Sequence, residues 1–196
     1  MNAFALPGGH VYVNRGLIER TSNVSEMAGI LAHEIGHVAA RHGAQNLQRQ
    51  MRTRSMARTM YQLILGREPL LDQEALDLGG ALWAARHSRA DEIEADQLAV
   101  RYLVRTGVDP RGMLSLFSTL YAEEQQIPGT EQVGWFSTHP GTAARMQATR
   151  RQIRALPEPS APLATDNDSY AAFLRRLTAL PPHLGFMLPP GHPPTR

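Results

Sequence analysis

The chain has 196 residues, no cysteine, and a net charge of +2 at neutral pH with histidine uncharged. A chain of this length can bury one substantial core, and the lack of cysteine excludes disulfides, zinc ribbons and thiol catalysis. The net charge is too small to indicate a nucleic-acid partner, and no apolar run approaches the roughly 20 residues of a membrane-spanning helix. We therefore expect a globular domain with neither a nucleic-acid partner nor a membrane span.

The first predicted elements are two short strands. Strand-forming residues, among them Phe4 and Val11-Tyr12-Val13, stand on both sides of Pro7-Gly8-Gly9. Proline and glycine in this arrangement mark a tight turn between extended segments. We therefore expect a hairpin, or a strand–turn–strand unit, within residues 3–18.

A long helical pattern follows over residues 24–60, in which Gly43 is a candidate break. Asn23 suits the N-cap and Glu26 the third helical position. Apolar residues recur beyond them at helical spacing, which predicts a face that packs against the core. These residues are Met27, Ile30, Leu31, Ile35 and Val38.

The same helix contains His33-Glu34-Ile35-Gly36-His37, the HExxH arrangement of zinc metallopeptidases. Residues four apart lie about 40° apart around a helix axis, so both histidines point the same way and can hold one zinc ion at roughly 2.0–2.1 Å. Glu34 projects beside them, where its carboxylate can polarise a metal-bound water. Because a histidine pair without a metal is costly to bury in a core-facing helix, we predict a metal site.

Beyond the motif, residues 45–58 form a basic amphipathic stretch. Such a stretch can bind a membrane surface or a partner protein, but it is more often a solvated face whose methionines fill the core side, and we favour that interpretation. Further helices are expected over residues 70–104, 111–124 and 142–156.

The composition then changes, because nine of the fourteen prolines fall between Pro157 and Pro194. We predict a mainly helical domain over residues 1–156 and a Pro-rich, largely irregular tail over residues 157–196. The tail contains one candidate short helix, around Tyr170, Phe173, Leu174 and Leu177. The predicted fold class is mainly α with a small β element (α+β).

Two histidines leave a zinc ion without the third protein ligand that catalytic sites usually have. A longer motif with histidine six residues after His37 fails here, because position 43 is glycine. His42 would lie about 140° around an uninterrupted helix from His37, which predicts a surface position or one in a second layer.

Glu92 and Asp96 are better candidates, since they lie four residues apart on one predicted helix. The glutamate can complete the metal ligands, and the aspartate can accept the outer N–H of a ligating histidine. The alternative is a solvated run of charges, but Ile93, Leu98 and Ala99 also give this segment an apolar face.

Several separated motifs together resemble one known family. They are His33-Glu34-Ile35-Gly36-His37-Val38, Ser88-Arg89 leading to Glu92-Ile93-Glu94-Ala95-Asp96, Ser137-Thr138-His139-Pro140, Ala5-Leu6-Pro7-Gly8-Gly9 and Thr106-Gly107-Val108-Asp109-Pro110. Over roughly residues 2–150, these motifs resemble the HtpX and CAAX-prenyl-protease family of zinc metallopeptidases, and within it the BepA-like branch.

The resemblance implies a zincin-like metallopeptidase domain with one zinc ion per chain and a role for each matching residue. The implied metal ligands are His33, His37 and Glu92, with Glu34 as general base and Asp96 behind the ligands. His139 and Arg145 would stabilise the oxyanion, although in BepA-like members this histidine can instead occupy the open zinc position and hold the enzyme inactive. Ala3, Phe4 and Ala5 would form an edge strand that pairs with an extended substrate.

The expected activity is hydrolysis of extended or unfolded polypeptides. The rival is a zinc-bound, chaperone-like or autoinhibited quality-control module that seldom cleaves, and a third alternative is a helix without metal. The resemblance places the protein in the cell envelope or periplasm. No charged and then apolar leader follows Met1, so the chain is either cytoplasmic or lacks its natural start. It departs from the family in having no membrane spans and no helical repeats after residue 150.

Overall fold

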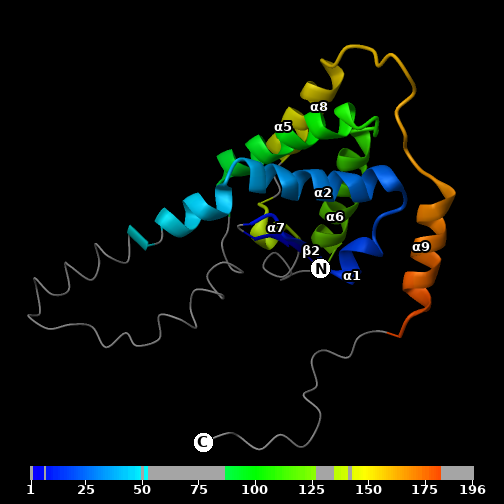
Figure 1. Cartoon of the computed structure of the whole chain (residues 1–196), viewed down its shortest axis with the longest axis horizontal. Helices are drawn as coiled ribbons and strands as arrows, with labels where there is room; N and C mark the ends of the chain where they lie inside the picture. Colours follow the sequence, from blue (N-terminus) through cyan, green and yellow to red (C-terminus); the bar gives the residue numbers. More distant parts are fainter. Residues whose placement is uncertain are drawn as a thin grey trace, which may run out of the picture.

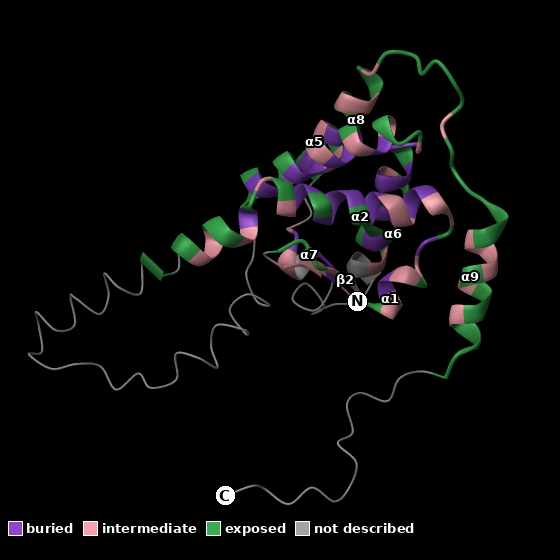
Figure 2. Ribbon diagram, in the orientation of Figure 1, coloured by how far each residue is buried: buried purple, intermediate pink, exposed green. Residues whose placement is uncertain are grey.

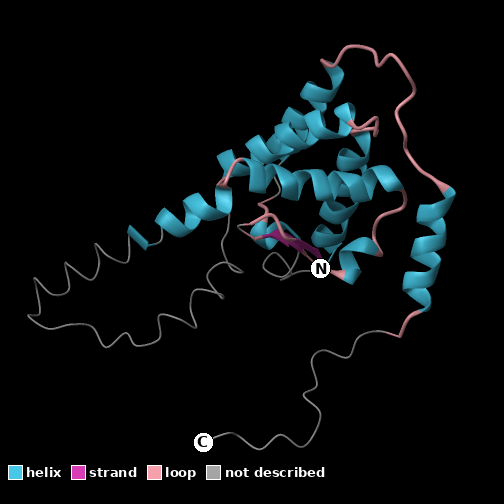
Figure 3. Cartoon of the chain, viewed as in Figure 1, coloured by secondary structure: helices cyan, strands magenta, loops and turns pink. Residues whose placement is uncertain are grey.

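The computed structural model describes residues 2–6, 8–49, 51–52, 87–126, 135–140 and 143–181. The elements, in chain order, are β1 (Ala3–Ala5), β2 (Val11–Val13), α1 (Arg15–Ile18), α2 (Val24–Ala39), α5 (Arg89–Arg105), α6 (Arg111–Gln126), α7 (Trp135–Thr138), α8 (Ala143–Arg154) and α9 (Asp168–Ala179). Residues 42–49 and 51–52 are also helical. The predicted mainly helical class with a small sheet is confirmed (Figure 3).

The two strands form the predicted hairpin. They pair antiparallel, with Ala3 opposite Val13 and Ala5 opposite Val11. Gly8 and Gly9 in the turn have φ angles of 106° and 92°, a region that side chains with a Cβ rarely enter, so this turn depends on glycine.

Helix α2 is the central element, and it packs against α5, α6 and the sheet (Figure 1). A glycine sets how closely α5 can approach. A Cβ atom built on Gly36 would lie 2.9 Å from the carbonyl oxygen of Ala95, which is closer than packed atoms come. Because Gly36 has no side chain, the backbones of the two helices meet directly beside the HExxH motif.

The apolar core is formed mainly where α2 packs against α5, α6 and α7. Its members are Ala3, Leu17, Ile30, Ala32, Ala99, Val100, Leu103, Met113, Leu116, Phe117, Leu120 and Trp135. The core therefore adjoins the face of α2 that bears the motif.

The apolar face predicted for α2 is partly wrong. Ile30 is buried as expected, but Leu31 and Ile35 are 36% and 48% exposed. The buried face is instead made of the motif's polar residues and small residues such as Gly29 and Ala32. The residues of α2 that are buried are those of the HExxH motif and the small residues at the close contact with α5. The spacing of large apolar residues does not predict the burial of either kind.

The segment that we call the C-terminal strap, residues 164–181, runs back along the outside of the domain (Figure 1). It contains α9, which includes Tyr170 and Phe173 and has no buried residue (Figure 2). Main-chain hydrogen bonds attach it: Asp109 N–H donates to the Ala164 carbonyl at 2.9 Å, and Ala164 N–H donates to the Gly107 carbonyl at 2.7 Å.

Parts of the predicted organisation lie outside the described residues. They are the basic stretch beyond position 52 and the portion of the helical segment expected over residues 70–104 that precedes position 87. Among the residues that the structure does describe, no helix is both long enough and apolar enough to cross a membrane.

Candidate metal centre

Helix α2 carries three of the predicted site residues in its last two turns. Its start is the one that the sequence predicted: Asn23 Oδ1 accepts the backbone N–H of Glu26 at 3.0 Å. The side chains of His33, Glu34 and His37 are all buried. The helix therefore directs the two histidines and the glutamate of the motif into the protein and not toward solvent.

Helix α5 supplies Glu92 and Asp96 from its first two turns. It begins with a capping box, in which Ser88 and Asp91 exchange side chain to backbone hydrogen bonds. This start sets the phase of the helix, so that Glu92 and Asp96 both face α2. Asp96 Oδ1 lies 3.0 Å from His33 Nδ1, on the side of the ring away from the motif's second histidine.

Four buried side chains converge between these elements: His33, His37, Glu92 and His139. One donor atom from each lies within 4.8 Å of the others. The Nε2 atoms of His33 and His37 are 3.0 Å apart, and they lie 3.4 and 3.2 Å from the Glu92 carboxylate. His139 Nδ1 lies 3.3 Å from His33 Nε2 and 3.1 Å from Glu92 Oε1.

These separations suit a tetrahedral zinc ion. Ligand bonds of about 2.0–2.2 Å give a tetrahedron whose edges are roughly 3.3–3.5 Å. The nitrogen–nitrogen distances of 3.0 and 3.3 Å lie at or slightly below that range, as do the distances of 3.2 and 3.1 Å from Glu92 Oε1 to His37 and His139. His33 faces the other oxygen of the same carboxylate at 3.4 Å. Three imidazole nitrogens and one carboxylate are also a donor set that zinc prefers. The residues present therefore fit the metal that the motif predicts.

The charges of the site support the same conclusion. Burial and the charge of His33 lower the pKa of His37 to about 2, against the opposing effect of Glu92. Burial alone would raise the pKa of Glu92, but the charges of His139 and Arg145 hold it well below its usual range. A neutral imidazole and an ionised carboxylate are the forms in which these side chains bind metal.

His33 differs from His37 in this respect. Burial would lower the pKa of His33, but hydrogen bonds to Asp96 and Glu92, together with their charges, raise it to about 9. The two carboxylates thus favour a positive charge at this position.

Arg145 lies beside the ligands and braces them. Its Nε and Nη2 donate to the two oxygens of Asp96 at 2.6 and 3.0 Å. Its Nη1 is 2.5 Å from Glu92 Oε2 and donates to the Pro140 carbonyl at 3.2 Å. The guanidinium thus ties α5 to the segment that carries His139, and its role at an oxyanion stays a prediction.

His139 is held over the site from the end of α7. Its ring stacks on Trp135, with centroids 4.2 Å apart and planes inclined by 18°. Its Nε2 atom lies 3.3 Å from the Ala3 carbonyl and 3.5 Å from Glu34 Oε1. The histidine therefore touches the ligands with one nitrogen, and both the strand and Glu34 with the other.

Strand β1 borders the site through its outer edge. Asn14 N–H donates to the Asn2 carbonyl, and Leu6 N–H donates to the His10 carbonyl. Bonded positions alternate along an antiparallel pair, so Ala3 and Ala5 direct their backbone groups away from β2. Ala3 is fully buried and its carbonyl reaches His139.

Two further histidines line the cluster. His42 is buried, with Nδ1 2.9 Å from His37 Nδ1, which confirms the second-layer alternative. His87, which the sequence did not single out, packs against the His37 ring with centroids 3.9 Å apart. Burial and the charge of His139 lower the pKa of His87 to about 4. In the sequence, the one local feature that could have pointed to His87 is its position directly before Ser88, the N-cap of the helix that carries Glu92.

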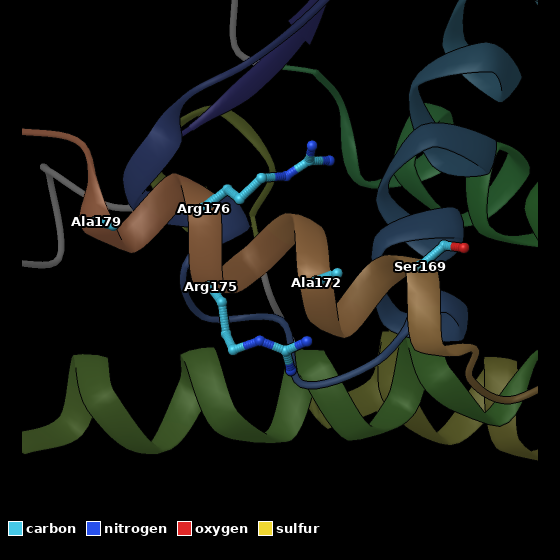
Figure 4. Close-up of a pocket in the computed structure, with 5 residues that line it drawn as sticks. All are labelled: Ser169, Ala172, Arg175, Arg176 and Ala179. Atoms are coloured by element: carbon cyan, nitrogen blue, oxygen red, sulfur yellow. The ribbon is translucent and has the colours of Figure 1, made fainter.

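A separate surface hollow lies along α9, with a volume of about 560 Å³ (Figure 4). It is lined by Ser169, Ala172, Arg175, Arg176 and Ala179. No group of metal-binding side chains lies there among the described residues, so the chemistry is concentrated at the cluster between α2 and α5.

Comparison with known proteins connects this cluster to a family. The sequence profile of Peptidase family M48 matches residues 1–153, which include every residue of the cluster. The chain is 31% identical over 172 residues to the beta-barrel assembly-enhancing protease of Yersinia pestis, an alignment that covers 82% of this chain and 34% of that protein.

Two other relatives have different names. The chain is 30% identical over 146 residues to the mitochondrial metalloendopeptidase OMA1 of Arabidopsis thaliana, covering 74% of this chain and 28% of the relative. It is also 30% identical over 156 residues to the metalloprotease LoiP of Escherichia coli (strain K12), covering 79% and 60%. The chain thus aligns with about a third of the length of the first two relatives.

Proposed function

The chain belongs to peptidase family M48, a family of zinc metallopeptidases, and from this premise we propose that it is a zinc-dependent endopeptidase that cleaves unfolded or misassembled proteins. The observation that carries the proposal is the buried set of four metal donors with Glu34 beside it. The set combines the ligands that the motif requires with a carboxylate placed for proton transfer.

In the proposed mechanism His33, His37 and Glu92 hold one zinc ion per chain. When bound, zinc lowers the pKa of a coordinated water to about 7 and polarises a substrate carbonyl. Glu34 takes the proton of the attacking water and passes it to the leaving amine. Its Oε1 atom is buried and accepts no hydrogen bond from the described residues, so it is available for that proton.

The substrate is proposed to bind as an extended strand on the outer edge of β1. Ala3 and Ala5 present their backbone groups there, while Phe4 bonds to β2 and stacks on Tyr12 with centroids 5.1 Å apart. Backbone pairing reads shape and not side chains, so broad specificity follows. Relatives named for β-barrel assembly support a role in quality control at the cell envelope.

A second candidate is an autoinhibited form of the same protein, which the position of His139 favours. With its Nδ1 near the ligands, this histidine completes a closed set of four donors, as in structural zinc sites. Its Nε2 atom also contacts the Ala3 carbonyl, the group that a paired substrate would use. A bound peptide would therefore compete with His139, and activity would require its displacement.

The first test is Glu34→Gln. Because this side chain is not a proposed ligand, the variant should keep one zinc per chain and lose cleavage of an unfolded protein such as casein by at least about 100-fold, the lower end of a general-base contribution. Elemental analysis and a casein assay measure the two effects. Retained cleavage in a zinc-loaded variant would rule out the mechanism.

His139→Ala separates the two candidates. If His139 acts mainly as an inhibitory ligand, casein cleavage by the variant rises above that of the wild type while zinc content stays the same. If it stabilises the oxyanion, cleavage falls by about 10²–10³-fold, the cost of losing one such donor in other enzymes. An unchanged rate would contradict both roles.

A further inference from the structure

We propose that His42 is a positioning residue for the metal centre: it accepts the outer N–H of His37 and so holds His37 in the tautomer that presents Nε2 to the metal. The inference rests on the proposed zinc site and adds a residue that neither the HExxH motif nor the acidic helix contains.

The backbone explains how His42 reaches this place. Helix α2 ends at Ala39, and Arg41 adopts a left-handed conformation with φ of 58°. A new helical run begins at residue 42. This turn cancels the rotation of about 140° that an uninterrupted helix would impose, so the His42 ring folds back onto His37 and not away from it.

The contact between the two rings requires one proton. The Nδ1 atoms of His37 and His42 are 2.9 Å apart, and two bare nitrogens or two N–H groups at that distance would repel each other. His37 faces the ligand cluster with Nε2 at 3.2 Å from Glu92 Oε1. When Nε2 binds a metal, the single proton of the neutral ring is on Nδ1, and His42 Nδ1 must be its acceptor.

The other nitrogen of His42 faces carboxylates that suit this arrangement. Its Nε2 atom lies 3.4 Å from Glu94 Oε2 and 4.0 Å from Asp91 Oδ1. Asp91 is itself fixed, since it accepts the backbone N–H of Ser88 and a bond from Arg49 at 3.3 Å. The carboxylates favour a proton on His42 Nε2, which leaves Nδ1 as the lone-pair acceptor for His37.

The two histidines of the motif are therefore held by different partners at their Nδ1 atoms. His33 has its Nδ1 directly against a carboxylate, Asp96, at 3.0 Å. His37 has the His42 ring in that place, and among the described residues its Nδ1 side reaches a carboxylate through that ring. Because His42 is 1% exposed, water cannot readily replace it as acceptor. Removing it would leave the His37 N–H buried without a partner.

The test compares His42→Leu with His42→Asn in the full chain. Leucine fills the space without an acceptor, whereas the amide oxygen of asparagine can stand where Nδ1 stood. We expect zinc affinity, measured by competition with a chelator, to fall by about 10–100-fold in His42→Leu, the usual cost of losing such a partner. Affinity in His42→Asn should stay within about 5-fold of the wild type, well short of that range.

Two further measurements separate positioning from loss of structure. Circular dichroism of the metal-free proteins shows whether each variant folds, and long-range ¹H–¹⁵N spectra of the zinc-loaded wild type report which nitrogen of His37 carries the proton. The inference expects Nδ1–H. A proton on Nε2, equal affinity in His42→Leu and wild type, or no rescue by asparagine would each overturn it. If the wild type bound no zinc, both this inference and the proposed function would be overturned.

Discussion

Helices α2 and α5 bury two histidines and five carboxylates, whereas the C-terminal strap lies on the surface and α9 has no buried residue. The helix pair is held by direct backbone contact at Gly36 and by the contacts of His33 and His37 with Glu92 and Asp96. The strap is held mainly by hydrogen bonds to α1, to the start of α2 and to the turn after α5.

The strap nevertheless contributes to the helix that carries the motif. Val24 N–H donates to Asp166 Oδ1 at 3.2 Å, and Ser25 N–H donates to the Thr165 carbonyl at 2.9 Å. These are the first two N–H groups of α2, which have no partner within the helix. Exposure is therefore a poor guide to what supports the site: the buried pair sets its geometry, and the strap completes the end of its main helix.

The largest expected effect comes from breaking the buried pair with Glu92→Ala. The variant loses a proposed zinc ligand and removes one of the two buried carboxylates that contact Arg145, so zinc should be lost and the unfolding free energy should fall by about 3–5 kcal/mol. Elemental analysis and chemical denaturation measure both. The control is Arg101→Ala on the exposed side of the same helix, which should change neither. One zinc per chain in Glu92→Ala would remove this residue from the site.

A smaller effect is expected from Gly36→Ala, which removes no ligand. The added Cβ meets the Ala95 backbone and forces the helices apart, at a cost of about 1–3 kcal/mol. Zinc affinity should fall as well, because His33 and His37 move relative to Glu92. Thermal unfolding and chelator competition test this, with Ile35→Ala as the control. That neighbour is 48% exposed, and its loss should cost no more than about 0.5 kcal/mol.

The smallest effect is expected from the strap, in Asp166→Ala. This change removes one acceptor from the start of α2 and should cost about 0.5–1 kcal/mol, the lower part of the range for helix caps. Zinc affinity should not change, because the site lies at the far end of the helix. Glu158→Ala, an exposed change outside the strap, is the control. If Asp166→Ala lost as much zinc affinity as Gly36→Ala, the strap and the α2–α5 pair would not act independently on the site.

Local sequence was sufficient where the relevant residues lie within a turn or two of each other. The hairpin followed from Pro7-Gly8-Gly9, and the start of α2 from Asn23. The spacing of His33 and His37 placed both on one helix face, where the structure also has them. The four-residue spacing of Glu92 and Asp96 predicted a shared face in the same way.

The local rules failed where the chain changes direction or where a distant segment supplies the neighbour. Leu31 and Ile35 match the apolar spacing, but α5 and α6 cover a different side of α2. The prediction of a break at Gly43 missed the turn at Arg41, which a residue other than glycine makes with positive φ.

The chemistry available to this protein can be read from its amino-acid sequence, which has a histidine pair and a glutamate at helical spacing, an acidic helix, and a family resemblance that covers most of the chain. Which of these groups meet depends on the tertiary structure. It placed His42 behind His37, packed His87 against the same ring, and brought the Ala3 carbonyl to His139. Helical periodicity acts over a few residues, whereas these contacts join segments related only by the packing of the helices and the turn after α2.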